Sequence, residues 1–193
     1  EPVTVSIVLD NEASADVNMS EATVIADEVI VRSSRAGSRT PVAHSTIGAS
    51  ELRKSDMTRD MPFLLSLMPS VVETSDAGNG IGYTSLRIRG TDANRINVTI
   101  DGIPLNDAES QQVFWVDLPD LASSAGTIQV QRGVGTSTNG AGAFGASVNI
   151  NTLSPDDDPG ASVDISAGSF NTFRATAKAW SGLTGDGFNM MIR

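Results

Sequence analysis

Three short blocks in a fixed order, within residues 85–152, constrain the fold of this chain more than any other feature. The blocks are Ser85-Leu-Arg-Ile-Arg-Gly90, Asn97-Val-Thr-Ile-Asp-Gly-Ile-Pro104 and Ile128-Gln-Val-Gln-Arg-Gly133, and a glycine-rich run then leads into Val148-Asn-Ile-Asn151. Each block joins a β-prone run to glycine, which is typical of a strand that ends in a turn. Because that pairing is common in β proteins, the order and spacing of the blocks carry the information.

Together, the blocks resemble the plug domain of TonB-dependent outer-membrane receptors. The segment from Asp60 to Val71 is similar to the leucine-rich helix and following strand of that family, although Ser70 stands where glycine is common. The resemblance covers residues 26–155 most fully. It implies a plug without catalytic activity, in a receptor that takes up a scarce nutrient such as a ferric siderophore, haem, cobalamin or a glycan.

The local signals predict an α+β domain in which short helices precede a small mixed sheet. We expect helices over 51–57 and 61–67, the first capped by Ser50 and the second bounded by Pro62 and Pro69. Strands are expected at about 71–74, 85–89, 96–101, 127–132 and 146–152, between clusters of Gly, Asn and Asp. Such a domain, predicted over 40–155, has a size that fits inside the lumen of a large barrel.

The chain changes character after Pro155. An acidic stretch precedes a regular alternation over 172–180, in which small or apolar side chains alternate with Arg174, Thr176 and Lys178. A strand between lipid and a polar lumen needs this alternation. Residues 156–193 are therefore predicted to be the first antiparallel strands of a transmembrane β-barrel, although the alternation alone fits a soluble β-meander equally well.

The N-terminal part divides into two segments. Residues 1–22 contain one alternating strand pattern and resemble the end of a carboxypeptidase-regulatory-like extension, with a loose tail as the alternative. Residues 23–39 resemble a tether with a TonB box, because an acidic, β-branched run is followed by Ser and Gly. The chain opens at Glu1 without a signal peptide, so we expect a fragment whose secretory signal was removed or lies elsewhere.

The acidic, β-branched run can add itself as a strand to the sheet of a partner. By resemblance, that partner is the periplasmic domain of TonB, together with the energy-transducing ExbB-ExbD complex. The candidate TonB-binding residues are Asp27, Glu28, Val29, Ile30 and Val31. From the residues alone, the same run could equally be an ordinary first strand of the domain.

Three loops between strand ends carry mixed aromatic and amide side chains, which are typical of recognition surfaces. They span 76–84, 91–95 and 104–116. By resemblance, such apical loops face the cell exterior and contact a small-molecule substrate. The candidate substrate-contacting residues are Asn79, Tyr83, Asn94, Asn106, Asp107, Glu109, Gln111 and Gln112.

Arginines stand beside the glycines that end two of the blocks. Solvated positions are the usual ones for arginine. The resemblance implies instead that Arg89 and Arg132 contact carboxylates on the inner wall of the barrel, a bidentate pairing that guanidinium groups favour. Those carboxylates would belong to the C-terminal barrel of the same protein, outside this chain.

Composition excludes several functions. A net charge of −10 with 13 Lys and Arg argues against a nucleic-acid partner. With no cysteine and His44 as the single histidine, we expect no metal site, no cofactor and no catalytic triad. The run from Gly140 to Gly145 matches the G-x-G-x-x-G dinucleotide fingerprint, but a strand is expected after it where the fingerprint needs a helix, so an NAD-binding enzyme is disfavoured.

The sequence therefore predicts a non-enzymatic receptor fragment in the outer membrane of a Gram-negative bacterium, with its plug and tether reaching the periplasm. Its expected partners are TonB, its own barrel, a small-molecule substrate and membrane lipid. The competing hypothesis is an autonomous secreted or surface β-rich binding module without energy coupling, in which residues 26–31 form a fixed internal strand.

Overall fold

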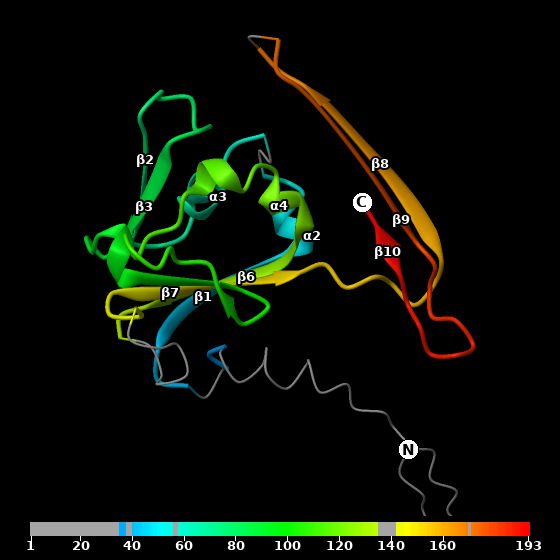
Figure 1. Cartoon of the computed structure of the whole chain (residues 1–193), viewed down its shortest axis with the longest axis horizontal. Helices are drawn as coiled ribbons and strands as arrows, with labels where there is room; N and C mark the ends of the chain where they lie inside the picture. Colours follow the sequence, from blue (N-terminus) through cyan, green and yellow to red (C-terminus); the bar gives the residue numbers. More distant parts are fainter. Residues whose placement is uncertain (1–34, 38–39, 56–57, 135–141, 170) are drawn as a thin grey trace, which may run out of the picture.

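The computed structural model describes residues 35–37, 40–55, 58–134, 142–169 and 171–193. The predicted α+β class is confirmed: a body of sheets and short helices, residues 40–155, is followed by a separate antiparallel sheet (Figure 1). The strand patterns at 3–9 and 26–31 lie outside the described residues. Among the described helices, none is long and apolar enough to cross a membrane.

A five-stranded mixed sheet forms the base of the body, in the order β1-β6-β7-β4-β5. Its strands are β1 Ala43–Gly48, β4 Ile96–Ile100, β5 Ile103–Pro104, β6 Ala125–Arg132 and β7 Ala146–Thr152. Only β4 and β7 run parallel to each other; the other neighbours are antiparallel. The strand that follows Gly145 is β7, as the sequence predicted, so the dinucleotide fingerprint lacks the helix that it needs.

The two faces of this sheet differ in chemistry because successive side chains of a strand point to opposite sides. One face carries the buried core residues Ile96, Val98, Ile128, Val130, Val148 and Ile150. The helices α2 Ala49–Leu52, α3 Met61–Leu65 and α4 Leu121–Ser124 lie over this face in Figure 1 and contribute Leu52, Leu64, Leu65 and Ala122 to the core. The opposite face, here called the polar face, consists of Asn97, Thr99, Gln129, Gln131, Ser147 and Asn149, which are also buried.

A hairpin of β2 Val71–Ser75 and β3 Thr84–Ile88 rises beside the helices (Figure 1). The carboxylate of Asp60, at the start of α3, accepts hydrogen bonds from the N–H of Gly82 (2.9 Å) and the hydroxyl of Thr84 (2.8 Å). Asp60 therefore ties the hairpin to the helix layer.

The sequence blocks end in turns that need unusual backbone. Arg89 and Gly90 have φ of 52° and 76°, and Asp101 and Gly102 have φ of 49° and 83°. Positive φ at both central residues is required by type I′ turns, the tight connections that suit twisted strands. The carboxylate of Asp101 also accepts hydrogen bonds from the N–H (2.9 Å) and hydroxyl (2.7 Å) of Thr152, so the second block fixes the end of β7.

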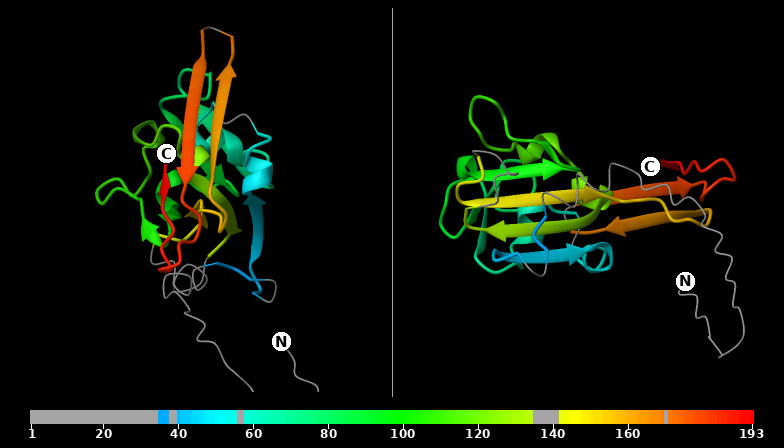
Figure 2. Two further views of the ribbon diagram at one scale, coloured as in Figure 1. Left: turned by 90° about the vertical axis from the view of Figure 1, so that its right-hand side faces the viewer. Right: turned by 90° about the horizontal axis from the view of Figure 1, so that it is seen from below.

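The C-terminal sheet, in the order β10-β9-β8, lies in front of the body in the left view of Figure 2 and beside it in the right view. Its strands are β8 Gly160–Ala167, β9 Phe173–Trp180 and β10 Met191–Ile192. The alternation predicted over 172–180 is confirmed, and its apolar side faces outward: Val163 and Ile165 are each 69% exposed. The polar side, with Thr176 buried, faces the body.

One local expectation was wrong, and one strand was missed. The helix expected over 51–57 is a single turn that begins after Gly48, not Ser50, because the side chain of Glu51 reaches back to accept a hydrogen bond from the Gly48 N–H (3.2 Å). Strand β1 was not predicted, because its sequence Ala-His-Ser-Thr-Ile-Gly lacks an alternation of apolar and polar residues. Among the described strands it pairs only with β6, at the edge of the sheet.

Candidate functional site

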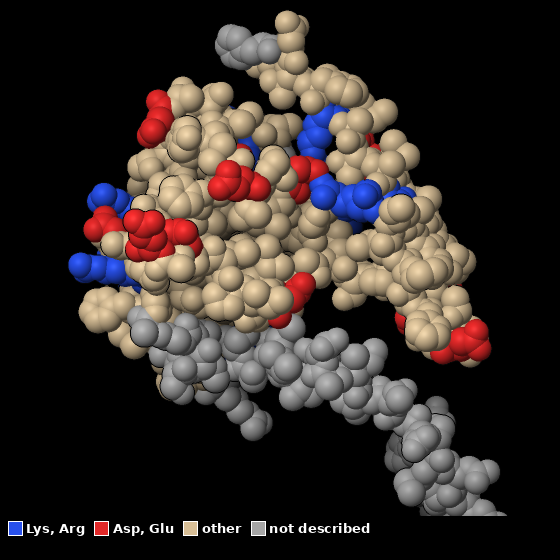
Figure 3. Space-filling view, in the orientation of Figure 1, with Lys and Arg blue, Asp and Glu red and all other residues tan. Residues whose placement is uncertain are grey.

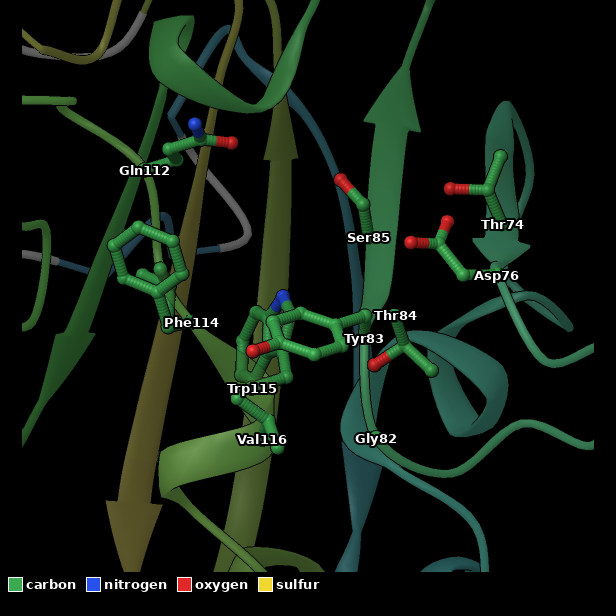
Figure 4. A pocket seen from close by; sticks show the side chains of 11 residues that line it. Thr74, Asp76, Gly82, Tyr83, Thr84, Ser85, Gln112, Phe114, Trp115 and Val116 are labelled. Atoms are coloured by element: carbon green, nitrogen blue, oxygen red, sulfur yellow. The ribbon is translucent and has the colours of Figure 1, made fainter.

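The β2–β3 hairpin and the loop over 105–116 enclose a groove (Figure 4). One part has a volume of about 170 Å³ and reaches from Thr74 and Tyr83 on the hairpin to Phe114 and Trp115 on the loop. A second part, of about 380 Å³, extends toward the short 3-10 helix η1, Ala93–Arg95. Both parts are lined by Thr74, Ser85 and Gln112, so we treat them as one groove.

The groove combines aromatic and polar surfaces. Trp115, in the 3-10 helix η2 Trp115–Asp117, is buried at 4% exposure, whereas Tyr83 is 70% exposed and Phe114 45% exposed. In Figure 4 the rings of Tyr83 and Trp115 lie in the middle, with Phe114 on one side of them and Asp76 and Thr74 on the other. Apolar walls with a few fixed polar groups are typical of small-molecule sites.

Three of the eight predicted substrate-contacting residues line this groove: Tyr83, Asn94 and Gln112. They come from β2–β3, η1 and the 105–116 loop, which are separate in sequence. Asn79 lies at the tip of the hairpin, where its side-chain oxygen accepts a hydrogen bond from the N–H of Ile81 (3.1 Å) and shapes the turn.

Asn106 extends the edge of β4. Its side-chain oxygen accepts from the N–H of Val98 (2.8 Å), and its amide nitrogen donates to the carbonyls of Ile96 (2.9 Å) and Gln111 (2.9 Å). The side chain therefore occupies the position of a neighbouring strand and fastens the groove loop to the sheet.

The next residues form a compact turn. The carboxylate of Asp107 accepts hydrogen bonds from the N–H (2.7 Å) and hydroxyl (2.8 Å) of Ser110 and from the N–H of Glu109 (3.2 Å). These bonds, those from Ser110 first, hold the pKa of Asp107 below its usual value. Gln111, with φ of 60°, closes the turn by donating to the carbonyl of Ala108 (2.9 Å), and Glu109 is exposed on it. The turn fixes the position of Gln112 in the groove.

Arg89 and Arg132, the predicted contacts to the barrel, make their observed contacts within the body. Arg132 donates to the hydroxyl of Ser45 (2.8 Å) across the β1–β6 pair. The guanidinium of Arg89 lies over Gly133, where an added Cβ would come within 3.2 Å of it. The first and third sequence blocks therefore meet at these residues, and pairing of either arginine with a barrel carboxylate stays a prediction.

Sequence reasoning missed the contacts between the body and the C-terminal sheet, which converge on α4. One oxygen of Asp120 lies 2.6 Å from the guanidinium of Arg174, and the other pairs with Arg193. Lys178 donates to the carbonyl of Ser123 (2.6 Å), and Arg193 donates to the hydroxyl of Ser124 (2.7 Å). In Figure 3, basic side chains gather between the body and the C-terminal strands. The sequence did show a polar side of the 172–180 strand, with Arg174 and Lys178 on it, but it did not show which residues these side chains would contact.

Within the described part of the chain, no group of three or more His, Cys, Asp or Glu side chains could hold a metal ion. The groove presents aromatic rings, amides and hydroxyls together with the charged side chains of Asp76, Arg87 and Asp92.

Comparison with known proteins shows that the chain matches a protein family. The family described as TonB-dependent Receptor Plug Domain matches residues 36–147, which is more than half of the chain. That match spans the three sequence blocks, both helices of the N-terminal half and all five strands of the central sheet up to the start of β7.

Two curated relatives match over most of the chain. The ferrienterobactin receptor of Escherichia coli is 29% identical over an alignment of 136 positions, which covers 65% of this chain and 18% of that protein. The ferric enterobactin receptor PirA of Pseudomonas aeruginosa is 26% identical over 143 residues, 69% of this chain and 19% of that protein. The chain thus spans about a fifth of the length of these relatives.

Solved structures share the fold. The alcaligin outer-membrane receptor FauA of Bordetella pertussis superposes with a TM-score of 0.61 at 22% identity, over 77% of this chain and 25% of that one. The ferric yersiniabactin uptake receptor FyuA of Yersinia pestis gives a TM-score of 0.59 at 18% identity, over 82% of this chain and 25% of that one. Both the body and the additional antiparallel strands therefore match the N-terminal part of such receptors.

Proposed function

Because the chain belongs to the family of TonB-dependent receptor plug domains, whose members are transporters and not enzymes, we propose that it is the N-terminal region of an outer-membrane receptor for energy-coupled nutrient uptake. The observation that carries this proposal is the inverted polarity of the C-terminal sheet. Val163 and Ile165 face outward, while Arg174 and Lys178 bind the body. A strand that separates lipid from an enclosed plug needs this arrangement.

The domain boundaries follow from this proposal. Residues 40–155 are the plug, and residues 156–193 are the first strands of a barrel that the rest of the receptor completes. Residues 23–39 are the tether with the TonB box, and residues 1–22 end an extension in front of it. The receptor resides in the outer membrane of a Gram-negative bacterium, with the tether on the periplasmic side.

The substrate in this proposal is a ferric siderophore. Support comes from the two curated relatives, which are named as ferric enterobactin receptors. The groove adds physical support, since it presents aromatic rings and amides to a bulky chelate, beside the charged side chains of Asp76, Arg87 and Asp92. Tyr83, Asn94 and Gln112 contact the substrate directly. Asn79, Asn106, Asp107, Glu109 and Gln111 are the remaining predicted contacts, and those with hydrogen bonds inside their loops also position the groove.

Uptake requires a connection from the groove to an energy source. In this proposal Asp27, Glu28, Val29, Ile30 and Val31 pair with the periplasmic domain of TonB as an added strand, since main-chain hydrogen bonds provide the affinity in this mode of recognition. TonB, driven by the ExbB-ExbD complex, then pulls on the tether, and the pull acts on the plug.

A titration with the periplasmic domain of TonB tests the coupling. Val29→Pro removes a main-chain donor and should abolish binding, whereas Val29→Ala keeps the donor and should bind within a few-fold of the wild type. Absence of binding by the folded wild-type protein would favour the autonomous binding module. Equal binding by wild type and Val29→Pro would place the contact elsewhere in the chain.

A further inference from the structure

The polar face of the central sheet is unusual because its side chains are polar and yet buried. Its six side chains, from β4, β6 and β7, are at most 7% exposed. The strand register aligns Gln129 with Asn149 and Asn149 with Thr99, so they form a row across the sheet. Thr99 donates to Asn149 (2.9 Å), and Gln131 donates to Gln129 (3.0 Å). Buried polar groups cost free energy unless they are hydrogen-bonded, so this face is suited to a polar partner and not to an apolar layer.

Gln129 supplies the most specific contact on this face. Its side-chain oxygen accepts from the N–H of Ala36 (2.7 Å), and its side-chain nitrogen donates to the carbonyl of Ala36 (3.0 Å). One side chain thus pairs with both main-chain groups of one residue, as a residue in an adjacent antiparallel strand does. Ala36 is 93 residues away in sequence and only 7% exposed.

Neighbouring contacts extend this docking. Arg35 donates to the hydroxyl of Thr127 (2.6 Å), and the Gln129 amide also donates to the hydroxyl of Thr46 on β1 (3.2 Å). Residues 35 and 36 therefore lie against β6 between its third residue, Thr127, and its fifth, Gln129. The chain enters β1 at Ala43, which pairs with Arg132 at the end of β6. Residues 36–43 consequently lead from the middle of β6 to its end.

We propose that the polar face is the docking surface for the chain's own N-terminal segment, and that Gln129 holds this segment by the peptide groups of Ala36. The occupant is specified by the contacts that Arg35 and Ala36 make with β6. The surface recognises main chain, so it fits an extended peptide and requires no particular side chain at position 36.

The consequence of this docking rests on the proposed function. With Ala36 docked, the tether is anchored to the body at residue 36; with Ala36 released, it is anchored at residue 43. At most about 3.5 Å per residue, release adds roughly 25 Å to the reach of the segment that carries residues 27–31. Gln129 therefore sets how far the tether extends toward its partner.

Hydrogen exchange of the Ala36 amide tests the docking in the purified intact receptor, without TonB. Gln129→Leu removes both bonds to Ala36 and should accelerate that exchange by roughly 10- to 50-fold, as the loss of two ordinary hydrogen bonds predicts. Thr127→Val keeps a strand-forming residue, removes only the Arg35 contact, and should accelerate exchange by about 5-fold. Thr99→Val is the matched control, because it removes a buried hydroxyl from the same face without touching Ala36.

The amide of Val130 reports on the sheet itself. The proposal is supported when Ala36 exchange accelerates in Gln129→Leu and Thr127→Val while Val130 stays protected and Thr99→Val resembles the wild type. If Gln129→Leu unfolds the sheet, the Ala36 exchange rate in Thr127→Val alone decides whether the segment docks on β6. Unchanged Ala36 exchange in a variant with a protected sheet overturns the proposal.

The same proteins separate this inference from the proposed function. If Ala36 exchange responds as expected but neither wild type nor variant binds the periplasmic domain of TonB, the docking surface stands and the coupling fails. If TonB binds and Ala36 exchange does not respond, the coupling stands and the docking surface is wrong.

Discussion

Asp120 and Arg174 face each other across the boundary between the body and the C-terminal sheet, with 2.6 Å between carboxylate and guanidinium. Asp120 also pairs with Arg193, and Lys178 binds the neighbouring Ser123 carbonyl, so the α4 turn is held by three cations. Asp120 has φ of 61°, a conformation that most residues avoid and that aspartate tolerates better than most. The acid thus lies on the plug and the bases lie on the strands, whereas the resemblance implied plug arginines paired with acids of the wall.

Asp120→Asn should loosen the plug from the strands. It removes the charge that two arginines share, and because these side chains are partly exposed we expect a loss of about 1–2 kcal/mol in the free energy of unfolding of the plug. Urea unfolding of the intact receptor measures this loss. Asp117→Asn, at a nearby exposed carboxylate, is the control and should change stability by less than about 0.5 kcal/mol.

Gly145→Ala should destabilise the body. A Cβ at this position would lie 2.7 Å from the Cβ of Thr91 and closer still to its hydroxyl oxygen, so the β3–η1 connection would have to move. We expect a cost of about 1–3 kcal/mol, as for other overpacked sites. Gly185→Ala, with no atom within 4 Å of the added Cβ, is the matched control. Thermal unfolding that is identical in both variants would contradict this packing role.

The 106–112 turn should loosen in acid. Hydrogen bonds from Ser110 and Glu109 lower the pKa of Asp107, so the folded turn favours the ionised carboxylate. Stabilisation is therefore fully present above the ordinary aspartate pKa of about 3.9 and is lost as the pH falls through the lower pKa of the folded state. The hydrogen-exchange protection factor of the Ser110 amide, which is corrected for the intrinsic pH dependence of exchange, measures the loss across this pH range. In Asp107→Asn this dependence should disappear, and its persistence would assign it to another group.

Substrate affinity should depend on the groove residues that different elements bring together. Tyr83→Ala and Gln112→Ala should each weaken binding of a ferric siderophore by about 5- to 30-fold, the range for well-placed contacts of this kind. Calorimetry with the intact receptor and ferric enterobactin as the probe measures the change. Lys54→Ala is the control, because Lys54 is exposed and lines neither part of the groove. Equal affinities in all three variants would remove the groove from the binding site.

The turns of the fold could be predicted because their chemistry is local. Asp101-Gly102 is a strong type I′ signal, and the strands on either side have clear β propensity. The polar face could not be predicted, because Gln129 and Gln131 alternate with apolar residues just as solvent-facing residues do. Their burial depends on what lies against the sheet, which no local pattern encodes.

The candidate site, like the fold, could be predicted from the sequence only in part. Loop composition placed Tyr83, Asn94 and Gln112 among the candidate contacts, because aromatic and amide residues at strand ends often bind ligands, and these three line the groove. It could not separate them from the amide of Asn106 or the carboxylate of Asp107, whose hydrogen bonds hold the loop itself in place. The partners of Arg174 and Lys178 were also out of reach, because the position of the C-terminal sheet against α4 depends on tertiary packing.

Uptake of a ferric siderophore into whole cells, measured together with binding to the same cells, tests the central claim most directly. The account predicts that the receptor with Val29→Pro binds ferric enterobactin as tightly as the wild type but accumulates no iron, whereas Val29→Ala does both. Accumulation by the Val29→Pro receptor at the wild-type rate would contradict energy coupling through residues 27–31.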